Sequence, residues 1–289
     1  EELENLSKYR MCFRELVQPD PNTSIGRFSA FLRTFDLSTV YPLVLGMMGA
    51  GLPDDEFAGM LEDLESYIFR RAVCELGTKN YNRFFLTVLG KLVKSQFNRQ
   101  NLRAALVEQK GDSVVWPDDA QFKQAWIGKP AYNSLGASRV QYALREIERR
   151  LHQPRAERIE ILSSLTVEHV LPSKWIEQWP FANGNRGVTW FEQFDNSRCL
   201  EDVEATAKRD RAKHTFGNLT LLTQPLNSSV SNSAFLIKKP EILKNSALAL
   251  NRYFQDKEGW DETSIAARGE NLFAHAAAKW PYSTSVATH

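Results

Sequence analysis

Residues 165–172 read LTVEHVLP, and this short stretch decides how the rest of the sequence is interpreted. Its apolar and β-branched residues, closed by a proline, are typical of a strand that ends in a turn. Residues 217–223 read GNLTLLT and form a second stretch of the same kind, closed by Pro225. Together they predict a pair of strands, the first of which carries Glu168 and His169 side by side.

The sequence before these strands predicts a series of helices. From residue 1 to about 108, apolar residues recur at spacings of three and four and are broken by Gly and Pro. Longer helices are predicted over 57–76, 80–99 and 138–152. Residues 111–130 contain prolines and paired aspartates, so we expect a loop with one short helix there.

The sequence around the second strand is more irregular. Residues 180–214 are polar and rich in both charges, which indicates an insertion with one helix near 199–212. Residues 233–253 have helical periodicity that is interrupted at Pro240.

The length of 289 residues allows two domains with buried cores. We expect a mainly α fold with a small α+β part, in which a helical linker or regulatory domain, 1–153, precedes a domain over 154–289 that holds the strands and C-terminal helices. The 43% hydrophobic and 25% charged residues are ordinary for a folded chain and exclude a disordered one.

Composition also limits the compartment and the partners. No run of about 18 apolar residues occurs and the N-terminal EELE has no basic region, so we expect a cytoplasmic protein without a membrane partner. The three cysteines form no CxxC pair, which argues against a disulfide framework or a zinc knuckle. Because the net charge is only +1, affinity for a polyanion would come from local clusters of Lys and Arg.

The order of these features is what a nuclease of the HNH, or ββα-metal, type requires. A strand with an acid and a histidine comes first, then a long loop, Gly-Asn with the second strand, another asparagine and a helix. In such a site the histidine takes a proton from water, which attacks phosphorus. A metal ion held by a few oxygen ligands stabilises the charge on the leaving oxygen.

A known family carries the same motifs. Residues 167–172 and 217–223, followed by further motifs within 226–239, resemble the HNH domain of GmrSD-type modification-dependent restriction enzymes, which include SspE- and BrxU-like proteins. Residues 64–71 and 78–82 resemble the helical region that precedes the nuclease in that family. The resemblance covers most of the chain and implies an endonuclease that nicks double-stranded DNA in the restriction of foreign DNA.

The resemblance also implies a second partner. Proteins of this family usually begin with a ParB-like nucleotide-hydrolysing sensor domain, which we do not find in this sequence. We therefore expect the chain to be a C-terminal fragment that works with that domain.

Roles for individual residues follow from the resemblance. It implies His169 as the general base, Glu168 as a metal ligand beside it and Asn227 as the second protein ligand. Asn218 would bond to backbone near the histidine and fix its orientation, and Asn232 would replace Asn227 if the register is shifted. Glu168 stands where aspartate is commoner in the family, so its coordination of the metal is either direct or mediated by a water molecule. Oxygen ligands favour Mg²⁺ or Mn²⁺ over zinc.

Basic residues near the strands are candidates for DNA contact. One cluster lies just before the second strand and either contacts phosphate or forms a solvated face, while another lies on the helix after the last asparagine, which docks on DNA in HNH folds. These residues are Lys208, Arg209, Arg211, Lys213, Lys238, Lys239 and Lys244. His214 either contacts phosphate or the second strand, or is a structural histidine.

Two other functions stay open from the sequence. The chain could be a catalytically inactive DNA-binding or regulatory module of a restriction system, in which the HNH fold only holds the duplex. It could also be an interaction scaffold that works through its helical N-terminal half. Nicking of a plasmid with Mg²⁺ separates the nuclease from both.

Overall fold

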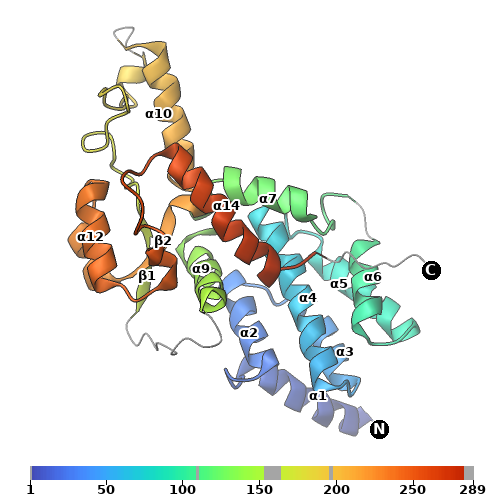
Figure 1. Ribbon diagram of the computed structural model, residues 1–289. Helices are drawn as coiled ribbons and strands as arrows, with labels where there is room; N and C mark the ends of the chain where they lie inside the picture. Colours follow the sequence, from blue (N-terminus) through green and yellow to red (C-terminus); the bar gives the residue numbers. More distant parts are fainter. Residues whose placement is uncertain (1, 109–110, 153–163, 195–197, 283–289) are drawn as a thin grey trace. The chain divides into compact units, whose positions relative to one another are not determined.

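The structure is a computed structural model that describes residues 2–108, 111–152, 164–194 and 198–282. These residues are mainly helical and include one two-stranded sheet (Figure 1). The expectation of a mainly α fold is therefore confirmed. No described helix is both long and apolar enough to span a membrane.

The chain forms two compact units. The first comprises Glu1–Phe122 with Trp280–His289, and the second comprises Lys123–Lys279. The boundary predicted between residues 153 and 154 lies outside the described residues and stays a prediction.

The first unit is helical. Its elements are α1 (Glu2–Val17), α2 (Ser24–Phe35), α3 (Tyr41–Gly49), α4 (Asp54–Val73), α5 (Tyr81–Lys94) and α6 (Arg99–Val107). The helix predicted over 57–76 is confirmed as α4, which starts earlier because acidic residues occupy its first turn. The helix predicted over 80–99 ends at Lys94, because Asn98 caps a new helix by accepting a hydrogen bond from the Asn101 amide.

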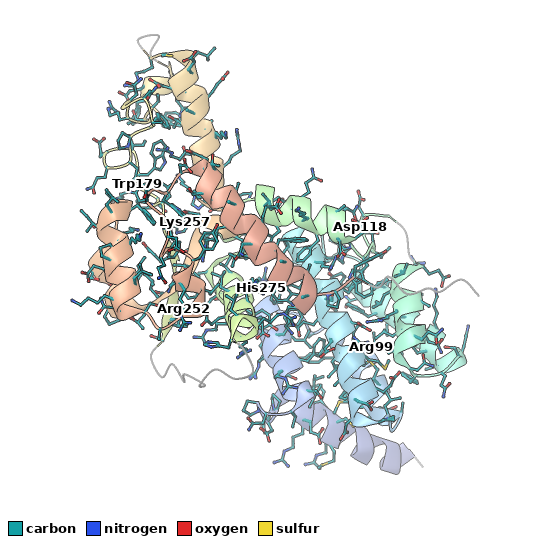
Figure 2. All side chains as sticks on the ribbon, in the orientation of Figure 1. Arg99, Asp118, Trp179, Arg252, Lys257 and His275 are labelled. Atoms are coloured by element: carbon teal, nitrogen blue, oxygen red, sulfur yellow. The ribbon has the colours of Figure 1, made fainter. Side chains whose placement is uncertain are left out.

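Buried charges hold α4 in the first unit. Arg70 and Arg71 are fully buried and donate to backbone carbonyl groups. Asp63 pairs with Arg103 and with Arg99, which is labelled in Figure 2. Because these buried charges are hydrogen-bonded, we interpret them as structural pairs that fix the packing of α4.

The second unit holds the strands. The elements from α7 onward are α7 (Asp119–Gly128), α8 (Ala131–Leu135), α9 (Ala137–Leu151), β1 (Leu165–His169), the 3₁₀ turn η1 (Glu192–Phe194), α10 (Leu200–Ala212), the 3₁₀ turn η2 (Phe216–Asn218), β2 (Leu219–Thr223), α11 (Gln224–Val230), α12 (Phe235–Asn245), α13 (Ala249–Arg252) and α14 (Glu262–Lys279). The helices predicted over 138–152 and near 199–212 are confirmed as α9 and α10, and the short helix expected within 111–130 is α7.

The two predicted strands pair with each other. β1 and β2 are antiparallel, with Glu168 opposite Thr220 and His169 opposite Leu219. β2 leads directly into α11, and Asn227 lies inside that helix. The sequence placed the helix after Asn227, and the structure shows that it starts before it.

The helical segment predicted over 233–253 is interrupted at another position than the predicted Pro240. Pro240 lies inside α12 without ending it, and the break comes after Asn245, before α13. Proline removes the hydrogen bond to the carbonyl four residues earlier, that of Leu236. Leu236 and Pro240 are both exposed, so water can hydrate that carbonyl.

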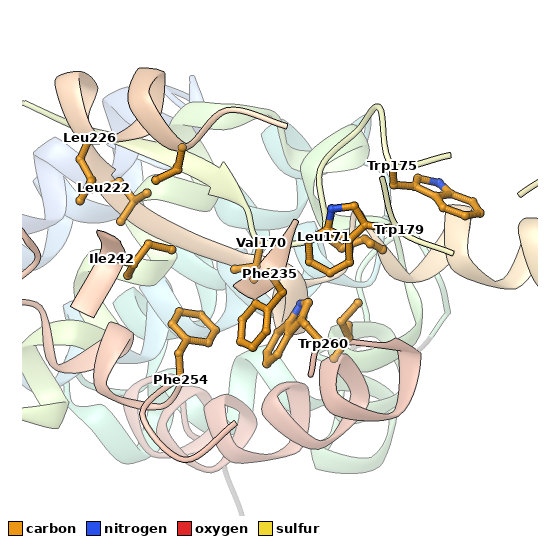
Figure 3. Packing of buried hydrophobic residues seen from close by; sticks show 12 residues of the cluster. Val170, Leu171, Trp175, Trp179, Leu222, Leu226, Phe235, Ile242, Phe254 and Trp260 are labelled. Carbon is orange, nitrogen blue, oxygen red and sulfur yellow. The ribbon is translucent and has the colours of Figure 1, made fainter. Parts of the chain in front are cut away.

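A hydrophobic cluster fixes the backbone just beyond β1 (Figure 3). Val170 and Leu171 are fully buried and belong to a cluster with Phe235, Phe254 and Trp260. Burial of one such side chain contributes about 1.5–3 kcal/mol. The end of the strand is therefore held in place, and with it the residues that precede Val170.

Gly217 allows α14 to approach the start of β2. A Cβ atom at this position would lie 2.0 Å from the carbonyl oxygen of Ile265, so only glycine fits. Arg268 of α14 is fully buried and donates to the carbonyls of Gly217 and Leu219. The helix thereby positions the start of β2, which pairs with the end of β1.

Candidate active site

A cavity of about 400 Å³ lies at the end of β1. Its lining residues come from β1, the turn after it, α11 and the segment after α11; they are Thr166, Glu168, His169, Pro172, Ser173, Gln224, Asn227, Ser228, Ser231 and Asn232. Four of the residues singled out in the sequence are among them. The structure therefore brings together Glu168, His169, Asn227 and Asn232.

His169 is the last residue of β1 and is only 9% exposed. Its Nε2 lies 3.1 Å from Nδ1 of His214, and the ring of Tyr132 packs edge-on with centroids 4.6 Å apart. Burial is the main cause that lowers the pKa of His169 to about 3. The ring is therefore neutral at pH 7 and can accept a proton.

Asn218 is fully buried, and its side chain makes four hydrogen bonds. Its Oδ1 accepts from the amide of Leu171 at 2.8 Å and from Nε1 of Trp260 at 2.9 Å. Its Nδ2 donates to the carbonyls of Leu171 and Lys213, both at 2.8 Å. The backbone contact near His169 that the family resemblance implied is present.

Asn227 faces β1 from α11. Its Nδ2 donates to Oγ1 of Thr166 at 2.8 Å and to the carbonyl of Val167 at 3.4 Å. Within the described part of the chain no donor pairs with its Oδ1. The bonds of Nδ2 therefore fix the amide group, and Oδ1 can bind a ligand. Asn232 is exposed and lies beyond the end of α11.

Glu168 and Lys238 form an ion pair, and Lys238 also donates to the carbonyl of His169 at 2.9 Å. The side chain of Lys238 is fully buried. Burial raises the pKa of Glu168 and lowers that of Lys238, while their mutual attraction opposes both shifts. Sequence reasoning assigned Lys238 to DNA, although its place on the apolar face of α12 between Phe235 and Ile242 could have indicated burial.

The remaining basic candidates differ in exposure. Arg209 is buried, pairs with Glu262 and donates to the carbonyl of Trp179 at 2.6 Å. Lys213 pairs with Asp210, and Lys239 donates to the carbonyl of Lys257, which is labelled in Figure 2.

Lys208, Arg211 and Lys244 are exposed and remain candidates for phosphate contact. The burial of Arg209 and Lys238 gives both a structural role. These two residues are therefore not part of the candidate DNA surface.

The donor atoms at the cavity bear on the kind of metal that would fit. No cluster of three or more His, Cys, Asp or Glu side chains able to hold a metal occurs among the described residues. The cavity offers the carboxylate of Glu168 and the amide oxygen of Asn227. Mg²⁺ keeps several waters and takes few protein oxygens, so this donor set fits it. Zinc usually takes four nitrogen and sulfur ligands, and the residues that the structure describes do not gather such a set.

Comparison with known proteins bears on the identity of the chain. No curated protein matches it. Residues 116–275 match the family model described as GmrSD restriction endonucleases, C-terminal domain, and this match covers more than half of the chain. The chain therefore belongs to the GmrSD restriction endonuclease C-terminal domain family.

Proposed function

We propose that this chain is a metal-dependent DNA endonuclease of the HNH type, with β1, β2 and α11 as its ββα core. The observation that carries the proposal is that one cavity is lined by Glu168, His169 and Asn227 together. Membership of a family described as restriction endonucleases supports the reaction class. DNA phosphodiesters are the proposed substrate, and restriction of foreign DNA in the cytoplasm is the proposed role.

In the proposed reaction, His169 acts as the general base. The neutral ring takes a proton from a water molecule, whose oxygen forms a bond to phosphorus as the ester bond on the opposite side breaks. The leaving oxygen then takes a proton from solvent. Burial makes His169 a weak base, and the negative charge of a DNA phosphate in the cavity would raise its pKa.

Glu168 and Asn227 are the proposed ligands for Mg²⁺ or Mn²⁺. Lys238 pairs with Oε1 of Glu168, and the residue lines the cavity in which a cation would bind. A bound divalent ion would stabilise negative charge on the leaving oxygen. Asn218 would act on His169 through the backbone, since its hydrogen bonds hold Leu171 two residues further along the chain.

Exposed cations of the second unit would bind the DNA backbone. Lys208 and Arg211 on α10 and Lys244 on α12 are exposed, and Lys213 and Lys239 are partly so.

One site of this kind cuts one strand at a time, so nicking is the proposed product. We also propose the ParB-like sensor domain as the partner that regulates cutting.

One observation favours a second candidate, the inactive DNA-binding module. The buried pair of Lys238 with Glu168 already neutralises the acid that the nuclease would use for a metal. If this pair excludes a divalent ion, the fold would hold DNA without cutting it.

Cleavage of supercoiled plasmid by the 289-residue chain tests the proposal. We expect open-circular product with Mg²⁺ or Mn²⁺ and none with EDTA. Asn227→Ala should raise the Mg²⁺ concentration needed for half-maximal rate, while the control Asn232→Ala should not. The reverse result would move the ligand to Asn232. DNA binding without nicking at any metal concentration would favour the inactive module. Absence of both DNA binding and nicking would favour a scaffold.

A further inference from the structure

His169 and His214 meet through their ring nitrogens. Nε2 of His169 lies 3.1 Å from Nδ1 of His214, and the two ring planes are at 89° to each other. At this distance one nitrogen donates a hydrogen and the other accepts it. The contact therefore ties the tautomer of one ring to that of the other.

Only one arrangement of the pair leaves His169 able to act as a base from its other nitrogen. If His214 donated, Nδ1 of His169 would carry the ring hydrogen and have no lone pair to offer. If His169 donates, its Nδ1 keeps a free lone pair, and none of the described residues hydrogen-bonds to that atom. We propose that His214 is a positioning residue that accepts the Nε2 hydrogen of His169 and keeps Nδ1 of His169 ready for water.

This inference rests on the proposed nuclease function of the cavity. The contact between the two histidine rings, however, is maintained by hydrogen bonds of the fold itself. Asn218 donates from one amide nitrogen to the carbonyls of Leu171 and Lys213, both at 2.8 Å. Leu171 follows the first histidine by two residues, and Lys213 directly precedes the second. The carbonyl of His214 also accepts from the amide of Tyr132 at 3.0 Å. These bonds fix the separation of the two rings.

The surroundings of His214 favour the neutral ring that an acceptor needs. Burial and then the neighbouring Lys213 lower the pKa of His214, against the attraction of Asp210. When the proton from water reaches Nδ1 of His169, the hydrogen on Nε2 stays in the bond to His214. That bond strengthens as His169 becomes charged, which stabilises the protonated ring.

Nitrogen-15 NMR of the histidine rings in the 289-residue chain tests the tautomer without any need for cleavage. We expect the Nε2–H form of His169, assigned by the loss of its signals in His169→Ala. His214→Asn keeps an acceptor near the position of Nδ1 and should preserve that form. His214→Leu removes the acceptor and should give a mixture. An Nδ1–H form of His169 in the wild type would overturn the proposal, even if the leucine variant does not fold.

Single-turnover cleavage gives the functional readout. We expect His214→Leu to lower the rate by about 10- to 100-fold with unchanged DNA affinity, and His214→Asn to recover most of it. An equal loss of rate in both variants, or a loss of DNA affinity in both, would overturn the positioning role. If the wild type cuts no DNA, the proposed function fails by itself, and the tautomer is still decided by NMR.

Discussion

Lys238 places a positive charge inside the second unit. Its side chain is fully buried against Glu168 and the backbone of His169, so it links α12 to β1. Removal of one partner from a buried pair leaves the other charge without compensation, which costs far more than the pair itself contributes. We therefore infer that Lys238 maintains the shape of the cavity and does not contact DNA.

Replacement of Lys238 tests this inference. Lys238→Met should lower the free energy of unfolding by about 3–5 kcal/mol, measured by urea denaturation, because Glu168 loses its buried partner. The matched control is Lys244→Met, an exposed position on the same helix, which should change stability by about 0.5 kcal/mol or less. Only the control should weaken DNA binding at a temperature where both variants are folded. Similar stability of the two variants would contradict the buried pair.

His169 gives the fold a dependence on pH. Its pKa falls from 6.5 to about 3 in the folded chain, chiefly because of burial. Between these two values the unfolded chain binds a proton that the folded chain does not, so stability is lost as pH falls through that window. We expect the drop in unfolding free energy from about pH 7 to about pH 4 to be smaller in His169→Gln than in the wild type. Identical pH dependence in the two proteins would contradict the burial of a neutral ring.

At the scale of elements, the contact between η2 and α14 depends on one missing side chain. Gly217 lies so close to the carbonyl of Ile265 that any Cβ would push the helix away. In contrast, a Cβ at Gly269 would meet Cα of Gly217 only at 3.8 Å, an ordinary contact. The two glycines lie at the same interface, but only Gly269 has room for a Cβ atom.

We expect Gly217→Ala to destabilise the chain by about 1–3 kcal/mol, the usual cost of forcing atoms into a packed region. Gly269→Ala should leave stability unchanged or raise it, because alanine favours the interior of a helix. Thermal unfolding of both variants checks this. Equal melting temperatures for the two would show that α14 does not pack against η2 as described.

The strands and several helices could be predicted because their signals are local. The two β-branched stretches closed by proline gave β1 and β2, and the spacing of apolar residues gave α4 and α9. The start of α11 does not follow from the sequence in the same way, because proline suits both the end of a strand and the first turn of a helix, where Pro225 lies.

The candidate site could be predicted only in part. Its residues and their order follow from motifs, but their partners come from segments that are distant in sequence. Glu168 and Lys238 are 70 residues apart, and the histidines that share a hydrogen bond are 45 apart. No periodicity connects such positions, so the sequence alone gives alternatives for His214 and indicates a DNA contact for Lys238.

For the whole molecule, all the candidate site residues belong to the second unit. The chain has a net charge of only +1. Its proposed affinity for DNA therefore comes from a few local cations that displace counterions from phosphates. We propose that the helical first unit connects this site to the sensor domain and takes no part in the chemistry.

This division predicts how cutting responds to conditions. Nicking of unmodified plasmid should fall steeply between about 50 and 200 mM salt, because DNA affinity comes mainly from phosphate contacts. Addition of GTP or ATP should leave the rate unchanged, since the 289 residues contain no GxxxxGK[ST] phosphate loop. A rate that responds to either nucleotide, or hydrolysis of either by this chain, would place sensing and cutting in the same chain.

We propose that His169 activates water at a metal-dependent nuclease site. The single-turnover rate of plasmid nicking by wild type and His169→Ala, in Mg²⁺ and with folding checked by circular dichroism, tests it most directly. We expect the rate to be lower by about 10²- to 10⁴-fold in the variant, the usual contribution of a positioned general base. Nicking by folded His169→Ala at close to the wild-type rate would contradict it.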